Sequence, residues 1–157
     1  MPWLAIIFGV LLAALLVGLA VYDFKHMILP NSLNAALAIG GLVQSIATQR
    51  PALVDAALGG LVAGGLLLAV SSTFRYARGF DGLGLGDVKL AAAGAVWTGV
   101  AGIGAILLVA TATCAAVVLL RAANGRGVDR LARFPFGPYL ALGGFAAWLA
   151  VQWNYYC

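Results

Sequence analysis

Long apolar runs dominate this 157-residue sequence and restrict what it can fold into. Residues 3–22 contain no charged side chain, and residues 90–120 contain none either. About 20 apolar residues span the hydrocarbon core of a bilayer as a helix, and helices satisfy their own backbone hydrogen bonds there. Apolar residues make up 64% of the chain and charged residues 9%, whereas a soluble domain has roughly a quarter charged residues. We therefore expect an all-α, polytopic membrane protein that forms one membrane-embedded domain over residues 1–157.

The apolar runs and the polar loops between them predict six transmembrane helices. Residues 88–120 would make a single helix of about 50 Å, which is too long for one crossing. The sequence Trp97-Thr98-Gly99 is the natural break, and it leaves a short fourth helix. Because no basic residue precedes the first run, we expect a retained helix and not a removed signal peptide. The expected helices cover 3–22, 33–48, 52–72, 88–97, 100–121 and 138–152.

The basic residues favour one orientation of these helices in the membrane. Of the nine Lys and Arg residues, only Arg50 falls outside the loops after the first, third and fifth helices and the entry to the fourth. Basic loops face the cytoplasm under the positive-inside rule. We therefore expect an inner-membrane protein with both termini outside. The net charge of +4 follows this distribution, so we do not expect nucleic-acid binding.

A glycine-rich stretch precedes the fourth helix and ends in an acid. Gly82, Gly84 and Gly86 alternate with leucines, and Asp87 then stands at the mouth of the apolar run. The spacing matches neither a dinucleotide-binding loop nor a Walker loop. An acid at the edge of a transmembrane segment is costly unless it is paired or used. The stretch therefore marks Asp87 as a candidate functional residue.

Asp23 is the second acid at an apolar boundary, and the predicted topology places it at the same cytoplasmic depth as Asp87. Two carboxylates that share a site hold one proton between them, so one can activate water while the other donates to a carbonyl. That is the chemistry of aspartic proteases, which needs no metal or cofactor. Two interfacial acids at helix ends are the structural alternative. There are also two alternative functions. The chain could be a small transporter or proton-relay protein that uses Asp23 and Asp87, or a non-catalytic membrane assembly subunit.

The other polar residues have simpler expected roles. Asp55 suits the N-terminus of the third helix, Asp129 lies among arginines, and Asp81 is a loop acid that could contact substrate. Lys89 is either a topology anchor or a source of positive field near Asp87. Gly60 and Gly64 have the spacing of a close helix-packing face, which we expect to act within the chain.

Three motifs carry a resemblance to a known family. Gly84-Leu85-Gly86-Asp87-Val88-Lys89-Leu90 resembles the GxGDxKL signature of the type IV prepilin peptidases, a class of membrane aspartic proteases. Asp23, followed by Leu29-Pro30-Asn31, resembles the family's other catalytic segment. The segment that begins Pro135-Phe136-Gly137-Pro138 is similar to its C-terminal PFGP motif. The motifs lie in family order and span nearly the whole chain.

The resemblance implies an endopeptidase that cuts the short basic leader from type IV pilin-like precursors at the cytoplasmic membrane face. Its partners would be these precursors and membrane lipid; the sequence does not indicate a number of subunits. The chain has no paired CxxC motifs, so we expect neither zinc binding nor N-methylation of the product. It is most similar to the small Flp/Tad-type or preflagellin-type peptidases. The resemblance implies that Asp23 and Asp87 are the catalytic residues. It also implies that the following motif residues support them: Gly84, Gly86, Lys89, Pro30, Asn31, Pro135, Gly137 and Pro138.

Overall fold

The computed structural model describes residues 2–78, 83–124 and 136–156, and within these ranges it contains helices and no strand. This confirms the all-α prediction. Asp81, Asp129 and Pro135 lie outside the described residues. The helices are α1 (Pro2–His26), α2 (Asn31–Thr48), α3 (Leu53–Arg78), α4 (Leu85–Thr98), the 3-10 helix η1 (Val100–Gly102), α5 (Ile103–Ala123) and α6 (Gly137–Tyr156).

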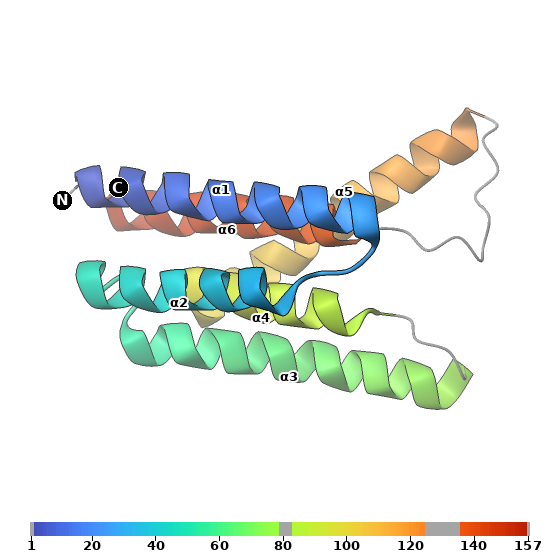
Figure 1. Cartoon of the computed structure of the whole chain (residues 1–157), viewed down its shortest axis with the longest axis horizontal. Helices are drawn as coiled ribbons and strands as arrows, with labels where there is room; N and C mark the ends of the chain where they lie inside the picture. Colours follow the sequence, from blue (N-terminus) through green and yellow to red (C-terminus); the bar gives the residue numbers. More distant parts are fainter. Residues whose placement is uncertain (1, 79–82, 125–135, 157) are drawn as a thin grey trace.

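The helices form an up-and-down bundle in which the two termini lie at the same end (Figure 1). At the opposite end, α1, α3 and α5 finish and α2, α4 and α6 begin. Among the described residues, three helices are long and apolar enough to cross a membrane: Trp3–His26, Leu53–Ala77 and Val100–Ala123. Six crossings and outward-facing termini stay predictions.

Three helices extend further toward the predicted cytoplasmic end than the sequence indicated. The first helix continues to His26, so Asp23 lies on the helix and not in the loop after it. The third helix continues to Arg78, and the fourth begins at Leu85, which puts Asp87 in its first turn. Polar side chains do not end a helix by themselves, and cations suit its C-terminal end. The apolar runs therefore predicted the apolar part of each of these helices but not its ends.

The predicted break after the fourth helix is confirmed at Gly99. This residue has a φ of +70°, in the left-handed region that favours glycine. Asp55 lies against it, and its Oδ1 atom accepts a hydrogen bond from the Val100 backbone N–H at 3.2 Å. Asp55 therefore lies at the start of α3 as expected, but it also supports the start of the next helical segment.

Trp97 fixes the position of α4 in the bundle. Its indole is fully buried, and its Nε1 atom donates a hydrogen bond to the Leu37 carbonyl of α2 at 2.7 Å. Gly40 and Gly41 make room for the ring, since a Cβ atom on either would lie within 2.8 Å of it. On the other side, Gly60 of α3 contacts α4 in the same way. The small residues of α3 thus form an intramolecular packing face, as predicted.

Gln44 connects three helices through its buried side chain. Its Nε2 atom donates to the Trp97 carbonyl of α4 at 3.3 Å, and its Oε1 atom accepts from Trp148 Nε1 of α6 at 2.8 Å. A buried amide is favourable only when its donors and acceptor are paired. These bonds therefore hold α2, α4 and α6 in one arrangement.

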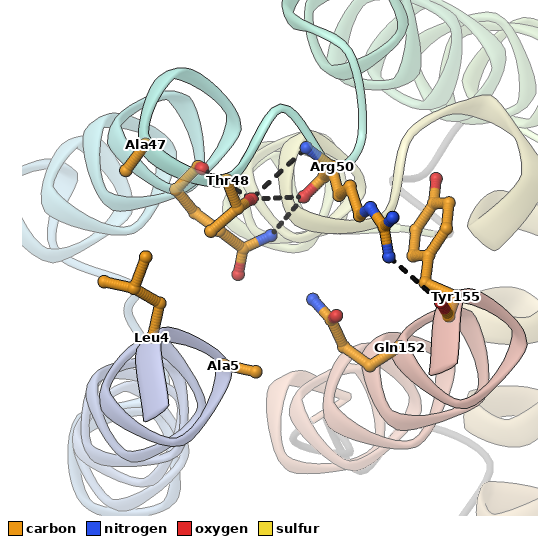
Figure 2. Close-up of a pocket in the computed structure, with 8 residues that line it drawn as sticks. Leu4, Ala5, Ala47, Thr48, Arg50, Gln152 and Tyr155 are labelled. Atoms are coloured by element: carbon orange, nitrogen blue, oxygen red, sulfur yellow. Dashed lines mark hydrogen bonds between the residues drawn. The ribbon is translucent and has the colours of Figure 1, made fainter. Parts of the chain in front are cut away.

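A polar cavity of about 420 Å³ lies beside Gln44, near the two termini. Figure 2 shows Gln152 of α6 pointing toward it, with Arg50 and Tyr155 at one side. The Arg50 guanidinium donates to the Tyr155 carbonyl at 2.9 Å and lies over the Tyr155 ring. Leu4 and Ala5, in the first turns of α1, also line the cavity. It is therefore at the opposite end of α1 from Asp23.

Candidate active site

Asp23 lies in the last turns of α1 and meets the beginning of α6. Its side chain is 6% exposed, and its Oδ2 atom accepts a hydrogen bond from the Gly137 backbone N–H at 3.1 Å. Gly137 is the first residue of α6, where helix N–H groups are free and the helix dipole favours a negative charge. A Cβ atom at this position would lie 2.6 Å from Oδ2. The absence of a side chain at Gly137 therefore lets the N-terminal end of α6 approach the Asp23 carboxylate.

The residues around Gly137 form the entry to α6. Pro138 is the second residue of the helix, where a missing N–H group costs nothing. The Phe136 carbonyl accepts hydrogen bonds from the N–H groups of Tyr139 and Leu140, both at 3.1 Å. Residues 136–138 thus start a helix whose first N–H donates a hydrogen bond to Asp23.

Asp87 lies in the first turn of α4, which begins after Gly84. Its backbone N–H bonds to the Gly84 carbonyl at 3.0 Å, and a Cβ atom on Gly84 would lie 3.2 Å from Asp87 Oδ2. Asp87 is outside the three candidate membrane spans. Burial and the neighbouring Asp23 carboxylate raise the pKa of Asp87 to about 6, against a smaller opposing effect of a backbone hydrogen bond with Gly84. The two acids, 64 positions apart in the sequence, therefore interact electrostatically.

The Leu-Pro-Asn segment between α1 and α2 packs against the glycine stretch. Leu29 is buried, and a Cβ atom on Gly86 would lie 3.1 Å from the Leu29 Cβ atom. Pro30 is the N-cap residue of α2, with an extended backbone at φ −66° and ψ 134°. Gly86 therefore allows α4 to approach the chain that follows Asp23.

Lys89 and Asn31 connect the same two segments through their side chains. The Lys89 Nζ atom donates a hydrogen bond to Asn31 Oδ1 at 2.8 Å. The sequence marked both residues but not their pairing, because nothing in the spacing of 58 positions indicates it. The structure thus gives Lys89 a specific partner in addition to the two roles that we expected.

Sequence reasoning missed one polar residue near this site. Asn34 lies one turn beyond Asn31 on α2 and is 5% exposed. Neither of its side-chain amide atoms has a hydrogen-bond partner among the described residues. Unpaired buried amides are rare in folded proteins. The only signal in the sequence was a second Asn at helical spacing.

The start of α4, the start of α6 and the segment that joins α1 to α2 therefore lie around the two carboxylates. The remaining sequence-predicted residue, Pro135, falls outside the described part of the chain. Among the described residues, the site thus contains two neighbouring carboxylates, and burial together with the Asp23 charge raises the pKa of Asp87 to about 6.

A family model agrees with these motifs. The model described as the type IV leader peptidase family matches residues 10–120, which include both acids. The chain belongs to the type IV leader peptidase family. A protein from Escherichia coli named leader peptidase HopD is 37% identical over 142 residues, which cover 88% of this chain and 89% of that protein.

Longer relatives match over almost the same part of this chain. A prepilin leader peptidase/N-methyltransferase of Xanthomonas campestris pv. campestris is 36% identical over 93% of this chain and 50% of the relative. One from Aeromonas hydrophila is 32% identical over 93% of this chain and 49% of the relative. The chain thus spans about half the length of these relatives. No solved structure matches it.

Proposed function

We propose that this chain is a membrane aspartic endopeptidase that removes the leader peptide of type IV pilin-like precursors. The proposal rests on family membership together with one observation, the interaction of Asp23 with Asp87. The positive-inside distribution of Lys and Arg supports a site at the cytoplasmic face of the inner membrane. Residues 1–157 would act as one domain.

In the proposed mechanism, the two carboxylates hold one proton between them. Asp87 keeps this proton below about pH 6 and donates it to the oxygen of the scissile carbonyl. Asp23, held by the Gly137 N–H, removes a proton from the attacking water. Collapse of the tetrahedral intermediate then breaks the C–N bond: protonated Asp23 gives its proton to the leaving amine, and a hydroxyl group of the intermediate returns a proton to Asp87. The sequence offers no zinc-binding CxxC pair, so N-methylation of the product is not part of the proposal.

The experiment is cleavage of a purified type IV pilin precursor by the purified enzyme in nanodiscs, with products identified by mass. We expect wild type to release the intact leader, and Asp23→Asn and Asp87→Asn each to lower kcat by about 10²–10⁴-fold. The matched control is Asp55→Asn at the start of α3, an acid outside the proposed pair, which should cleave at the wild-type rate. Normal cleavage by either pair variant would rule out the mechanism. No cleavage by wild type would rule out the substrate class.

A further inference from the structure

The polar cavity beside Gln44 has no part in the proposed peptidase mechanism. It has a volume of about 420 Å³ and is lined by residues from the ends of α1, α2 and α6. Leu4 and Ala5 line it from the first turns of α1, whereas Asp23 lies in the last turns of that helix. The cavity is therefore a second candidate binding site, separate from the carboxylate pair.

Gln152 of α6 leaves an unpaired polar group in this cavity. Its side chain is only 9% exposed, points toward the cavity, and makes no hydrogen bond to the other residues drawn in Figure 2. The Gln44 amide, which also lines the cavity, is instead hydrogen-bonded within the bundle. A buried amide is unfavourable unless its donor and its acceptor are both paired. Gln152 therefore favours a polar occupant that completes its hydrogen bonds.

The charges around the cavity favour an anion. Arg50 brings a positive charge to one side of it, and the hydrogen bond from its guanidinium to the Tyr155 carbonyl at 2.9 Å fixes this position. No acidic residue is among the described residues that line the cavity. Guanidinium and amide N–H groups are donors that match the oxygens of a phosphate or a carboxylate. The cavity thus offers donors and a positive charge, with no acid in its lining to repel an anion.

Exposed aromatic side chains indicate that the cavity lies at the depth of lipid headgroups. Trp3 precedes Leu4 on α1, Trp153 follows Gln152 on α6, and both tryptophans are exposed. Tyr155, which lines the cavity, is also exposed. Trp and Tyr are enriched at membrane–water interfaces, where their rings lie at the level of the headgroups. The phosphates of phospholipids occupy the same depth.

An apolar surface continues from the cavity toward the middle of the bundle. Ile7 and Leu11 follow Leu4 at the spacing of one helix face, and both are exposed. On α2, the exposed Val43 lies one turn before Ala47, which lines the cavity. Acyl chains attached to a phosphate in the cavity would cover these residues, whereas a free phosphate ion has no group that does so. The surface therefore favours a phospholipid over a free ion.

We propose that this cavity binds the phosphate of a membrane phospholipid, with Gln152 and Arg50 as donors and the acyl chains on the exposed faces of α1 and α2. Polar pockets with basic residues between transmembrane helices are a known kind of headgroup site. A bound lipid would hold the ends of α1, α2 and α6 together and stabilise the folded protein. The inference does not depend on the proposed peptidase function, because it concerns binding at the other end of the bundle.

The first test measures lipid binding by the full chain, purified in a neutral detergent and stripped of lipid. Native mass spectrometry counts the bound lipid, and thermal unfolding gives the melting temperature. We expect added phosphatidylglycerol to bind in one copy and to raise the melting temperature, and diacylglycerol with the same acyl chains to do neither. Equal binding of diacylglycerol would overturn the phosphate site. A rise with inorganic phosphate alone, as large as that with phosphatidylglycerol, would overturn a lipid as the source of the phosphate.

The second test changes the two proposed donors. Gln152→Leu should raise the Kd for phosphatidylglycerol about ten-fold, whereas Asn154→Leu, at an exposed position of the same helix that does not line the cavity, should not change it. Arg50→Gln should weaken binding by a similar factor. Its matched control is Arg75→Gln, which removes the same charge near the other end of the bundle. Wild-type affinity in either Gln152→Leu or Arg50→Gln would overturn the site and would indicate a cavity that holds only water.

Discussion

The backbone N–H of Gly137 donates a hydrogen bond to the Asp23 carboxylate across 114 positions of sequence. This contact joins the first helix to the last, and it gives the PFGP segment a physical role in the site. The carboxylate accepts a bond from the free first turn of α6, and the absence of a Cβ atom makes the approach possible. The orientation of Asp23 therefore depends on a residue that carries no side chain.

Gly137→Ala should impair catalysis more than stability. Its Cβ atom would lie 2.6 Å from Asp23 Oδ2, so either the carboxylate or the start of α6 has to move. A displacement of about 1 Å at a reacting group costs on the order of 100-fold in rate. We expect a loss of this size in kcat for precursor cleavage, with KM little changed.

Gly144→Ala is the matched control for this variant, on the same helix. A Cβ atom there would lie 3.8 Å from the Leu16 Cδ1 atom, an ordinary contact. It should retain normal kcat. Wild-type kcat in Gly137→Ala, with the protein folded, would contradict the role of the Gly137–Asp23 approach.

The Lys89–Asn31 hydrogen bond should be measurable as a coupling between two segments of the site. We expect Lys89→Met and Asn31→Leu each to slow cleavage, and the double variant to be no slower than the worse single one. Bonds to charged groups contribute about 1.5–3 kcal/mol when protected from water, but both residues are exposed, so we expect a coupling of about 1 kcal/mol or less. A double-mutant cycle in kcat/KM measures it.

Lys89→Arg serves as the conservative control, because it keeps a donor for Asn31. It should recover part of the activity that Lys89→Met loses. Strictly additive single effects in the cycle would show that the bond does not couple the two segments.

The pH dependence of cleavage should show an alkaline limb that reports on Asp87. The pKa of this group is raised to about 6, so the pair loses its shared proton as the pH rises through that value. We expect kcat/KM of the free enzyme to fall above about pH 6. A profile that rises steadily from pH 6 to 8 would contradict the assignment of the proton to the pair.

The same group should make stability depend on pH in a definite direction. A folded-state pKa above the usual 3.8 means that the folded protein binds more protons than the unfolded one between about pH 4 and 6. The stabilising contribution is complete below that window and is lost as the pH rises through it. The melting temperature of wild type should therefore fall relative to Asp87→Asn between pH 4 and 6, because Asn does not titrate. A difference in melting temperature between wild type and Asp87→Asn that stays constant from pH 4 to 6 would contradict this prediction.

Asp55 should stabilise the break between α4 and α5. Asp55→Ala removes the acceptor for the Val100 N–H, and the loss of such a cap costs about 1 kcal/mol. Thermal unfolding in detergent should show the decrease. Asp55→Asn keeps an acceptor oxygen and should be nearly as stable as wild type. An Asp55→Ala protein with unchanged stability would show that the break is set by Gly99 alone.

The sequence was sufficient for the helices, the break at Gly99 and the motifs, because each is a local pattern. Apolar runs indicate which segments can form helices in lipid, and the length of residues 88–120 requires a break that the Gly99 position can provide. The expected ends of the first and fourth helices, at residues 22 and 88, were wrong by four and three residues, since a helix continues past an apolar run without changing its hydrogen bonds. The placement of Asp23 and Asp87 at the ends of these helices was right, and each acid lies inside the last or first turns.

The contacts within the site could not be predicted from the sequence in the same way. The pairing of Lys89 with Asn31, and of Gly137 with Asp23, depends on how α1, α2, α4 and α6 pack together. Helix packing in lipid is decided by small residues and a few polar bonds, which the hydropathy pattern does not record. The unpaired amide of Asn34 is visible only after the helices are assembled.

The most direct test of the central claim compares Asp23→Asn, Asp87→Asn and the double variant in cleavage of the same precursor. Groups that act as one catalytic unit have non-additive effects on rate. We predict that each single variant loses about 10²–10⁴-fold in kcat and that the double variant is no slower than the slower single one. Two smaller losses that multiply in the double variant, or full activity without either carboxylate, would contradict an Asp23–Asp87 pair.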